Sequence, residues 1–527
     1  MPPDPVFILG KTWTDGFLDH ARAPGELRIR AWAWWPLERL VDVYLAQPRS
    51  LRRLWNYLRE VGAKELLLKV RSRLAESLRD RKFISAGFGE VLEADADAVH
   101  PVGAAVAFVA PWHPECMQRV CLPPAFVTPI DDALAQRWRR DEALLLIRNK
   151  PNPQSPDWSP LAGWSRFSGA PIDQASGVVL GWATEQLRRI DPASCESLAS
   201  PRAAVAAERT PSVSPQSGRM SAVLFGLGNY AKTCIIPKLD PRIQLTCIHE
   251  IDPTQIGVNR LPGVSYDTSG AVRPDEKYDV YLIAGYHHTH ADLAVHALRS
   301  GAWAVVEKPI VTTREQLDAL LATMKDHPGR FFAGLNKRYD PLWGLARQDL
   351  QLAPGEPVNY HCIVFEVPLV RRHWYNWPNS GSRIVSNGTH WLDHFQFMNG
   401  FAAPCRADLW KARNGDIHAS VELDNGATFN MSLTDHGSAR LGLQDHIQLR
   451  AKGVTVTVEN ASRYRAEDRF RVLRRKHVNR LTAFRVMYET ISRKIVAGEP
   501  GDSVDSVRRS SELMLALEAQ VQRANSE

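Results

Sequence analysis

Short apolar runs and amphipathic stretches alternate between residue 220 and about residue 335. Apolar runs at residues 221–225, 243–252, 278–285, 303–309 and 331–336 have the composition of buried strands, and residues 291–301 and 312–329 between them have helical spacing. Thr313 and Gln316 are spaced as a capping box at the start of the second helix. Strands separated by helices favour a parallel, doubly wound sheet. Residues 220–340 are therefore predicted to form an α/β Rossmann domain.

The pattern changes after about Tyr360. Residues 416–433 alternate apolar and polar positions on both sides of Asn425-Gly426, which is a strong hairpin signal. Residues 446–460 repeat the alternation, and Val507 to Val521 form a helical stretch with Met514 and Leu517 on its apolar stripe. We therefore expect residues 341–527 to form an α+β domain with an antiparallel sheet.

The N-terminal part has a different organisation. Alternation at residues 27–33 and short β-like runs at residues 83–130, punctuated by Gly and Pro, indicate a small barrel, and residues 37–80 have helical spacing. Residues 190–219 are rich in Pro, Ser and Ala and lose all apolar periodicity. The boundaries are thus a mostly β domain at residues 1–150, a helical segment with a linker at 151–219, and the two domains above.

Composition narrows the class of protein. The chain has 527 residues, 44% of them hydrophobic, and no apolar run approaches the ~20 residues that span a bilayer. The start of the chain does not read as a signal peptide. Its seven cysteines are scattered without a CxxC pair, which predicts a reducing compartment, the cytoplasm, and neither a disulfide framework nor a structural zinc site. The net charge of +7 and the basic run at residues 469–477 are interpreted as solvated surface, so no nucleic-acid partner is expected.

Residues 226–231, GLGNYA, join the first predicted strand to a helix. Gly226 permits a tight turn, and Gly228 lets the backbone approach a pyrophosphate at the helix N-terminus. The candidate cofactor-binding residues here are Gly226, Gly228, Asn229 and Tyr230. Glu250 ends the next strand and is spaced to accept hydrogen bonds from ribose hydroxyls. The following Ile251 offers no cation for a 2′-phosphate, which favours NAD(H) over NADP(H). A plain turn without ligand, and a surface carboxylate at Glu250, remain as alternatives.

Glu307-Lys308-Pro309 closes the strand at residues 303–309. A lysine at the carboxyl edge of a parallel strand points into the cleft in which ligands of such sheets bind. The tripeptide thus marks a second candidate site for cofactor and substrate.

These motifs, with AGYHHTHADLAVHAL, GLNKRYDP and GTHWLD, occur in the order and spacing of the Gfo/Idh/MocA oxidoreductases, which residues 220–525 resemble. The resemblance implies that Lys308 contacts the nicotinamide ribose and the substrate hydroxyl, and that His390 is a general base. It also implies that Glu307 and His290 lie beside the cofactor and that Asn336 and Arg338 line the active site. Further substrate-binding candidates are Arg383, Asn387 and Asp393.

Two departures from the family pattern stand out. The usual proline near His290 is absent, and Tyr286 and His287 stand in that region. Ser386 occupies the place of the aspartate that precedes the histidine by four residues, so the carboxylate that would orient and stabilise the His390 imidazole is missing. Asn387 offers a hydrogen bond there but no charge. The missing carboxylate therefore indicates that the acid–base chemistry of His390 is altered or weakened. The alternative for His390, a helix histidine whose hydrogen bonds are satisfied in the core, also remains open.

The segment Arg371 to Arg383 is rich in aromatic and basic residues. Aromatic side chains of this kind can stack on a sugar face, and arginines can bind a diphosphate. A packed loop with a basic rim is an equally good interpretation of the segment.

Residues 20–145 resemble the GroES-like domain of medium-chain alcohol dehydrogenases, without the usual zinc-site cysteine and histidine and with Ala104 in place of an aspartate. His113, Cys116 and Cys121 fit no structural zinc spacing, so no metal is expected. The whole arrangement resembles bacterial bi-domain oxidoreductases associated with surface polysaccharide synthesis, which implies a sugar-type substrate.

Three functions stay open. The preferred one is an NAD(P)-dependent oxidoreductase that transfers a hydride to or from a CH–OH carbon of a sugar or nucleotide sugar. The second is a C=N reductase, for which the missing carboxylate matters less. The third is a non-catalytic binding protein that keeps the cofactor fold. A homo-oligomer formed through the C-terminal sheet is expected in addition.

Overall fold

The structure is a computed structural model. It describes residues 25–36, 83–93, 100–110, 119–122, 127–138, 144–147, parts of 180–198, 218–250 except Asn229, parts of 261–280, 281–368, 375, 380–438 and 442–526. The chain forms two compact units. The first comprises Met1–Arg49, Val70–Ser217 and Thr246–Ala271, and the second comprises Ser50–Lys69, Gly218–Leu245 and Val272–Glu527.

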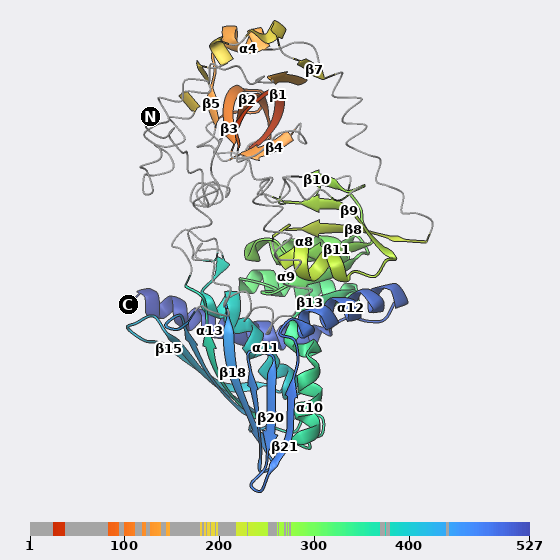
Figure 1. The fold of residues 1–527 in the computed structure, drawn as a ribbon, viewed down its shortest axis with the longest axis vertical. Helices are drawn as coiled ribbons and strands as arrows, with labels where there is room; N and C mark the ends of the chain where they lie inside the picture. Colours follow the sequence, from red (N-terminus) through yellow and green to blue (C-terminus); the bar gives the residue numbers. More distant parts are fainter. Residues whose placement is uncertain are drawn as a thin grey trace, which may run out of the picture. The chain divides into compact units, whose positions relative to one another are not determined.

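The N-terminal strands form one sheet of 7 strands in the order β5-β3-β2-β1-β6-β7, with β4 paired to β1 (Figure 1). These strands are β1 (Gly25–Pro36), β2 (Phe83–Glu93), β3 (Ala105–Ala110), β4 (Arg119–Leu122), β5 (Val127–Pro129), β6 (Leu144–Ile147) and β7 (Glu196–Leu198). The strands predicted at residues 27–33 and 83–130 are thus confirmed. The helical prediction for residues 37–80 lies outside the described residues, and the GroES-like identity stays a prediction. Strand β7 lies inside the stretch that composition predicts as a linker.

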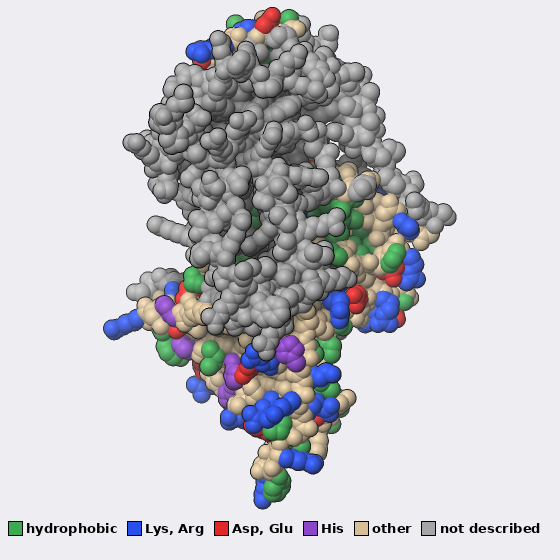
Figure 2. All heavy atoms as spheres, in the orientation of Figure 1, with side chains coloured by type: hydrophobic (Ala, Val, Ile, Leu, Met, Phe, Trp, Pro, Cys, Tyr) green, Lys and Arg blue, Asp and Glu red, His purple; other side chains and the backbone are tan. Residues whose placement is uncertain are grey.

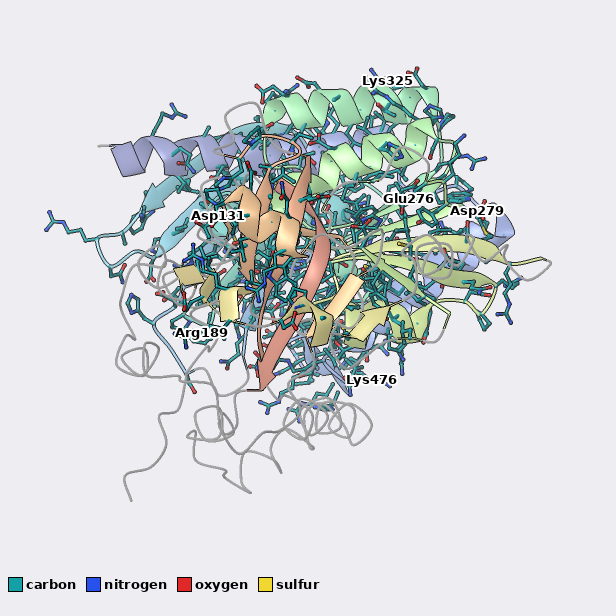
Figure 3. All side chains as sticks on the ribbon, turned by 90° about the horizontal axis from the view of Figure 1, so that it is seen from above. Asp131, Arg189, Glu276, Asp279, Lys325 and Lys476 are labelled. Atoms are coloured by element: carbon teal, nitrogen blue, oxygen red, sulfur yellow. The ribbon has the colours of Figure 1, made fainter. Side chains whose placement is uncertain are left out.

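Six strands form a parallel sheet in the order β10-β9-β8-β11-β12-β13. They are β8 (Met220–Phe225), β9 (Ile243–His249), β10 (Ser265–Asp267), β11 (Val280–Ile283), β12 (Trp303–Glu307) and β13 (Phe331–Gly334). Numbered in chain order, this is the 3-2-1-4-5-6 arrangement of a dinucleotide-binding Rossmann sheet. Asp279, labelled in Figure 3, accepts hydrogen bonds from the backbone and hydroxyl of Ser221, which joins the starts of β8 and β11. The predicted Rossmann fold is confirmed.

Helices α8 (His290–Arg299) and α9 (Arg314–Asp326) pack side by side against this sheet (Figure 1). Thr313 accepts a hydrogen bond from the backbone of Gln316 at 3.3 Å, as the capping box predicts. The Gln316 side chain accepts from the backbone of Thr312, one residue earlier than the usual partner. Where a helix is predicted after β8, the structure has a π-helix at Ala231–Ile235 and a 3₁₀ helix at Ile236–Lys238. Pro237 has no N–H to continue an α-helix here.

The C-terminal sheet has 8 strands in the order β15-β16-β17-β14-β18-β19-β20-β21. They are β14 (Asn359–Phe365), β15 (Pro404–Lys411), β16 (Ile417–Leu423), β17 (Thr428–Thr434), β18 (Gln444–Ala451), β19 (Val454–Glu459), β20 (Arg463–Glu467) and β21 (Val472–His477). The hairpin at Asn425-Gly426 is confirmed as β16 and β17. The expectation of a purely antiparallel sheet is wrong in one place, because β14 pairs parallel with β17 and the sheet is mixed.

Helices cover one face of this sheet. They are α10 (Pro341–Asp349), α11 (Thr389–Met398), α12 (Thr482–Ala497) and α13 (Val504–Ser526), and a π-helix at Ile384–Gly388 leads into α11. Tyr360 of β14 is fully buried and packs on His394 and Phe395 of α11. Met514 and Leu517 are buried, which confirms the apolar stripe of the last helix.

The other face of the sheet is exposed and carries much of its charge. Figure 2 shows Lys and Arg side chains over the part of this sheet that is labelled β20 and β21 in Figure 1. The exposed ones are Arg463, Arg465, Arg469, Arg471, Arg474, Arg475 and Lys476. Among the described helices, none is both long enough and apolar enough to cross a membrane.

Candidate active site

The turn after β8 has two glycines with different surroundings. Gly226 has φ +92, and a Cβ there would lie 2.4 Å from the carbonyl oxygen of Ala284, so only glycine fits. A Cβ on Gly228 would meet no atom within 4 Å. This turn lies where the strand order reverses between β8 and β11, which is where ligands of such sheets bind. The open backbone at Gly228 fits the approach of a pyrophosphate.

Tyr230, the next described residue of the turn, points into the protein. Its hydroxyl donates to Oε1 of Glu307 at 2.8 Å, and the hydroxyl of Tyr488 on α12 donates to the same oxygen. Burial raises the pKa of Glu307, and the two hydroxyls offset part of that rise. Burial and the neighbouring Glu307 likewise hold the pKa of Tyr230 well above its usual value. The cluster ties the glycine turn, β12 and α12 together beside Lys308.

Lys308 directly follows β12, at the carboxyl edge of the sheet. Its Nζ donates to the backbone oxygen of Ser386 at 2.6 Å, and lies 3.4 Å from the Tyr375 hydroxyl and 3.5 Å from Oδ1 of Asn387. The Tyr375 ring centroid is 5.5 Å away. The end of β12 and the segment leading into α11 thus meet at Lys308. The cofactor and substrate roles of Lys308 and Asn387 stay predictions.

Behind Asn387 lies a carboxylate that the sequence did not single out. Glu366 follows β14 and is 5% exposed. Its Oε1 accepts from Nδ2 of Asn387 at 2.5 Å, and its Oε2 accepts from Nε of Arg383 at 2.5 Å. Arg383 also donates to the backbone oxygen of Gly415, and its buried Nη2 has no partner among the described residues. Arg383 is therefore positioned by Glu366 and retains one free donor.

His390 lies in the first turn of α11 and is half-buried. Burial lowers its pKa well below the usual value, and the cations Lys308 and Lys337 lower it further. The imidazole is therefore neutral near pH 7 and can accept a proton. Among the described residues, Nδ1 of His390 and Oδ1 of Asn336 are buried atoms without a hydrogen-bond partner. Such atoms are costly unless a ligand or water satisfies them.

His290 starts α8 and is buried against backbone carbonyls. Its Nδ1 lies 2.7 Å from the oxygen of Pro309 and its Nε2 lies 3.2 Å from the oxygen of Gly285. Burial lowers its pKa to about 4. His287 lies nearby, with Nδ1 3.1 Å from the oxygen of Ser380 and its ring 4.8 Å from that of Tyr375. A neutral imidazole has one N–H, so His290 donates to one of these two carbonyl oxygens, and both of its ring nitrogens face the backbone around Lys308.

Arg338 and Asp393, predicted to bind substrate, pair with each other. The guanidinium contacts both carboxylate oxygens, and the two side chains are 5% and 1% exposed. Arg338 also pairs with Asp502 at 2.7 Å, and Asp393 accepts from Ser510 at 2.6 Å. Their polar groups are used in joining η8 (Asn336–Tyr339), α11 and the segment that begins α13, so we leave both residues out of the proposed site.

The remaining predicted residues are less informative. Glu250 directly follows β9, is 7% exposed, and its backbone N–H donates to the oxygen of Asp267 at 2.8 Å. Asn229 lies outside the described residues. Its role and the ribose role of Glu250 stay predictions.

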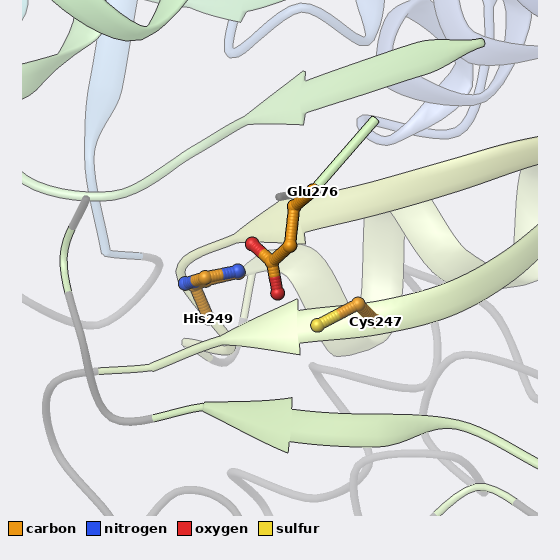
Figure 4. Close-up of side chains that lie close together, drawn as sticks. All are labelled: Cys247, His249 and Glu276. Carbon is orange, nitrogen blue, oxygen red and sulfur yellow. The ribbon is translucent and has the colours of Figure 1, made fainter. Parts of the chain in front are cut away.

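Two groups of potential metal ligands occur among the described residues. They are Cys247, His249 and Glu276, drawn in Figure 4, and Asp416, Asp435 and His436. His249 and Glu276 have other interactions, and His436 is exposed. Neither group argues for a metal, and the expected absence of one stays a prediction.

Comparison with known proteins gives one family match. Residues 220–335 match the family model GFO_IDH_MocA, described as "Oxidoreductase family, NAD-binding Rossmann fold". This part of the chain is thus similar to the NAD-binding Rossmann domain of that oxidoreductase family.

Individual relatives are distant. "Putative oxidoreductase YteT" of Bacillus subtilis is 23% identical over 195 residues, which are 34% of this chain and 45% of that protein. The match thus spans less than half of that relative. A Gfo/Idh/MocA family oxidoreductase from Vibrio cholerae has a TM-score of 0.46 and 14% identity, covering 58% of this chain and 100% of that one. The WlbA dehydrogenase of Chromobacterium violaceum, solved with NADH and UDP-GlcNAcA, has a TM-score of 0.48 and 14% identity, covering 59% and 96%.

Sequence reasoning missed three residues that the structure brings to this region, Glu366, Tyr375 and Tyr488. Tyr375 lies in the aromatic segment that was noted as a whole, but Glu366 and Tyr488 carry no motif. A buried strand that ends in a glutamate was the only available signal for Glu366.

Proposed function

We propose that this chain is an NAD(H)-dependent oxidoreductase that acts on a CH–OH carbon, or the corresponding ketone, of a sugar or nucleotide-sugar type substrate. The observation that supports this best is the position of Lys308, which lies at the carboxyl edge of a 3-2-1-4-5-6 sheet and contacts the segment that leads into α11. The NAD-binding family match of residues 220–335 supports the cofactor. The preference for NAD(H) over NADP(H) rests on Glu250 and Ile251.

The bound cofactor would supply or accept the hydride, and the protein must handle the proton and the charge. The ammonium of Lys308 stabilises negative charge that develops on the substrate oxygen. His390 is neutral near pH 7, and its unpaired ring nitrogen accepts the proton of the hydroxyl, or returns it in the reverse direction. The free Nη2 of Arg383 and the Oδ1 of Asn336 offer a donor and an acceptor to a polyhydroxylated substrate.

The proposal extends to the rest of the chain. Residues 1–150 would form a GroES-like domain without redox chemistry of its own. The chain would act in the cytoplasm on precursors of a bacterial surface polysaccharide and would assemble through the C-terminal sheet.

Calorimetry and absorbance of the reduced nicotinamide test the proposal. NAD(H) should bind in the micromolar range, about −8 kcal/mol. Sugars and nucleotide sugars with a free hydroxyl should reduce NAD⁺ in the presence of the protein. Oxidation of NADH by cyclic imines but not by ketosugars would favour a C=N reductase. Binding of NAD(H) without turnover on either class would favour the non-catalytic function, and absence of NAD(H) and NADP(H) binding would contradict all three.

A further inference from the structure

The family pattern places an aspartate where this chain has Ser386, yet a carboxylate reaches the same region from another element. Glu366 follows β14, 20 positions before Ser386 in the chain, and is 5% exposed. Its backbone N–H donates to the oxygen of Thr434 at 2.8 Å, so the position of the residue is set by the pairing of β14 with β17. The carboxylate is therefore held by the sheet, independently of α11.

The two oxygens of Glu366 have different donors. Oε2 accepts from Nε of Arg383, and Oε1 accepts from Nδ2 of Asn387, both at 2.5 Å. An ionised carboxylate only accepts hydrogen bonds, so Asn387 must turn its NH₂ group toward Glu366. The amide oxygen then faces Nζ of Lys308, at 3.5 Å. If the Asn387 amide were reversed, its NH₂ group would face the ammonium of Lys308, and both groups are donors.

We propose that Glu366 is a positioning residue of this site: it fixes the Asn387 amide so that its oxygen accepts from Lys308. The part of the inference that concerns catalysis rests on the proposed function. The part that concerns the orientation of Lys308 rests on the contacts alone.

The charged and titratable groups around this chain of contacts come from several elements. Among the described residues, Lys308 is faced by Glu307 of β12, His287 of the 3₁₀ turn before α8, His290 of α8, His390 of α11, and Tyr375. Glu366 is faced by Arg383. In this described set the carboxylates are Glu307 and Glu366, and Glu307 is held by Tyr230 and Tyr488. Without Glu366, Arg383 would be left as a cation next to the same amide.

A pair of variants tests the inference by exchanging the two groups. In Glu366→Gln, one of the donors from Arg383 and Asn387 meets an NH₂ group, and the amide is no longer fixed. In Glu366→Gln with Asn387→Asp, the new amide accepts from Arg383 and donates to the new carboxylate, whose second oxygen accepts from Lys308. We expect the single variant to lower kcat about tenfold and the double variant to recover most of that loss. The KM for NAD(H) should stay constant in both.

A second readout needs no substrate. The rate at which an amine-reactive reagent modifies Lys308 at a fixed pH near 8, followed by peptide mass spectrometry, should rise about threefold to tenfold in the single variant, because the Asn387 oxygen then no longer holds the Lys308 amine. The double variant should return to the wild-type rate. Glu356→Gln, which removes an exposed ion pair with Lys452, is the matched control and should leave both readouts unchanged.

The outcomes separate the two hypotheses. A changed Lys308 rate that the double variant restores supports the positioning role, even if no sugar substrate is ever turned over. If the single variant is too unstable to isolate, Asn387→Asp alone is compared with the double variant: their Lys308 rates should differ, because Glu366 then faces a second carboxylate, and equal rates would contradict the positioning role. Equal Lys308 modification rates in the wild type and the single variant would show that Glu366 does not influence Lys308. Its ion pair with Arg383 would then have only a structural role, and the inference would be wrong.

Discussion

Lys308 and His390 have opposite surroundings at the scale of single residues. Lys308 has three acceptors within 3.5 Å, from Ser386, Asn387 and Tyr375. The Nδ1 of His390 has no partner among the described residues. A cation held by neutral acceptors and a neutral imidazole with an unpaired nitrogen suit a reaction in which charge develops on an oxygen while its proton moves.

Replacement of either residue should therefore reduce turnover much more than cofactor binding. We expect Lys308→Ala and His390→Ala each to lower kcat by about 10²–10⁴-fold, the usual contribution of general acid–base groups. Steady-state kinetics together with calorimetry of NAD(H) binding would measure both effects. Lys325→Ala, at an exposed position on α9 (Figure 3), is the control. If both variants keep the wild-type kcat, the reaction takes place at another site.

Burial of His290 makes stability depend on pH. Its pKa is about 4 in the folded protein and about 6.5 in an unfolded chain, so the unfolded state takes up the proton first as the pH falls. The stabilisation is complete above about pH 6.5 and is lost as the pH approaches 4. Between pH 6.5 and pH 5 this group alone should lower the free energy of unfolding by about 2 kcal/mol.

Chemical denaturation at several pH values would measure this effect. His290→Gln keeps a donor for one backbone carbonyl and does not titrate, so its free energy of unfolding should fall less steeply below pH 6.5 than that of the wild type. His446→Gln, at an exposed position on β18, serves as the comparison. Parallel slopes in the wild type and His290→Gln would show that His290 is not held neutral.

At the scale of elements, the turn after β8 contains two glycines with different expected roles. The fold requires Gly226, and we expect the cofactor to bind at Gly228. A Cβ at Gly226 would lie 2.4 Å from the oxygen of Ala284, and φ is +92, so Gly226→Ala should destabilise the fold by several kcal/mol, ~3 or more. A side chain at Gly228 meets open space. Gly228→Trp should therefore leave the melting temperature nearly unchanged and abolish NAD(H) binding.

Thermal unfolding and calorimetry on the same two variants would test this contrast. Gly344→Trp, at an exposed position of α10 where a Cβ also meets nothing within 4 Å and φ is not positive, controls for the effect of an exposed aromatic residue. If Gly228→Trp still binds NAD(H) with wild-type affinity, the pyrophosphate does not lie on this turn.

At the scale of the whole molecule, the open face of the C-terminal sheet carries exposed apolar side chains. Ile363 is 58% exposed and Trp410 is 59% exposed. They lie in one row across the sheet, since Ile363 pairs with Ser432, Ser432 with His418, and His418 with Trp410. Apolar groups in such a row are typical of a surface that another copy of the chain covers.

We therefore expect a homo-oligomer that dissociates when this face becomes charged. Light scattering should give at least twice the mass of the 59.1 kDa chain for the wild type and a monomer for Ile363→Asp with Trp410→Asp. Val102→Asp, at a position 64% exposed in the other unit, should not change the mass. A monomeric wild type would contradict the expectation.

Local patterns predicted what depends on local chemistry. The alternation of apolar runs and helical stretches predicted the Rossmann domain because each strand and helix must present one apolar face. The hairpin at Asn425-Gly426 followed from turn chemistry alone. After β8 the structure has a π-helix and a 3₁₀ helix in place of the regular helix that was predicted, because Pro237 interrupts it. The parallel pairing of β14 with β17 carries no local signal.

In the candidate site, too, some features were predicted from the sequence and others became visible only in the tertiary structure. The sequence determined the glycine turn, the lysine at the end of β12 and the absence of a carboxylate at Ser386, since each is a matter of residue type next to a predicted element. Only the tertiary structure decided that Arg338 is neutralised by Asp393 and that Glu366 reaches Lys308 through Asn387. Hydrogen-bond partners between elements depend on how sheets and helices pack, and the period of a single strand or helix contains no information about them.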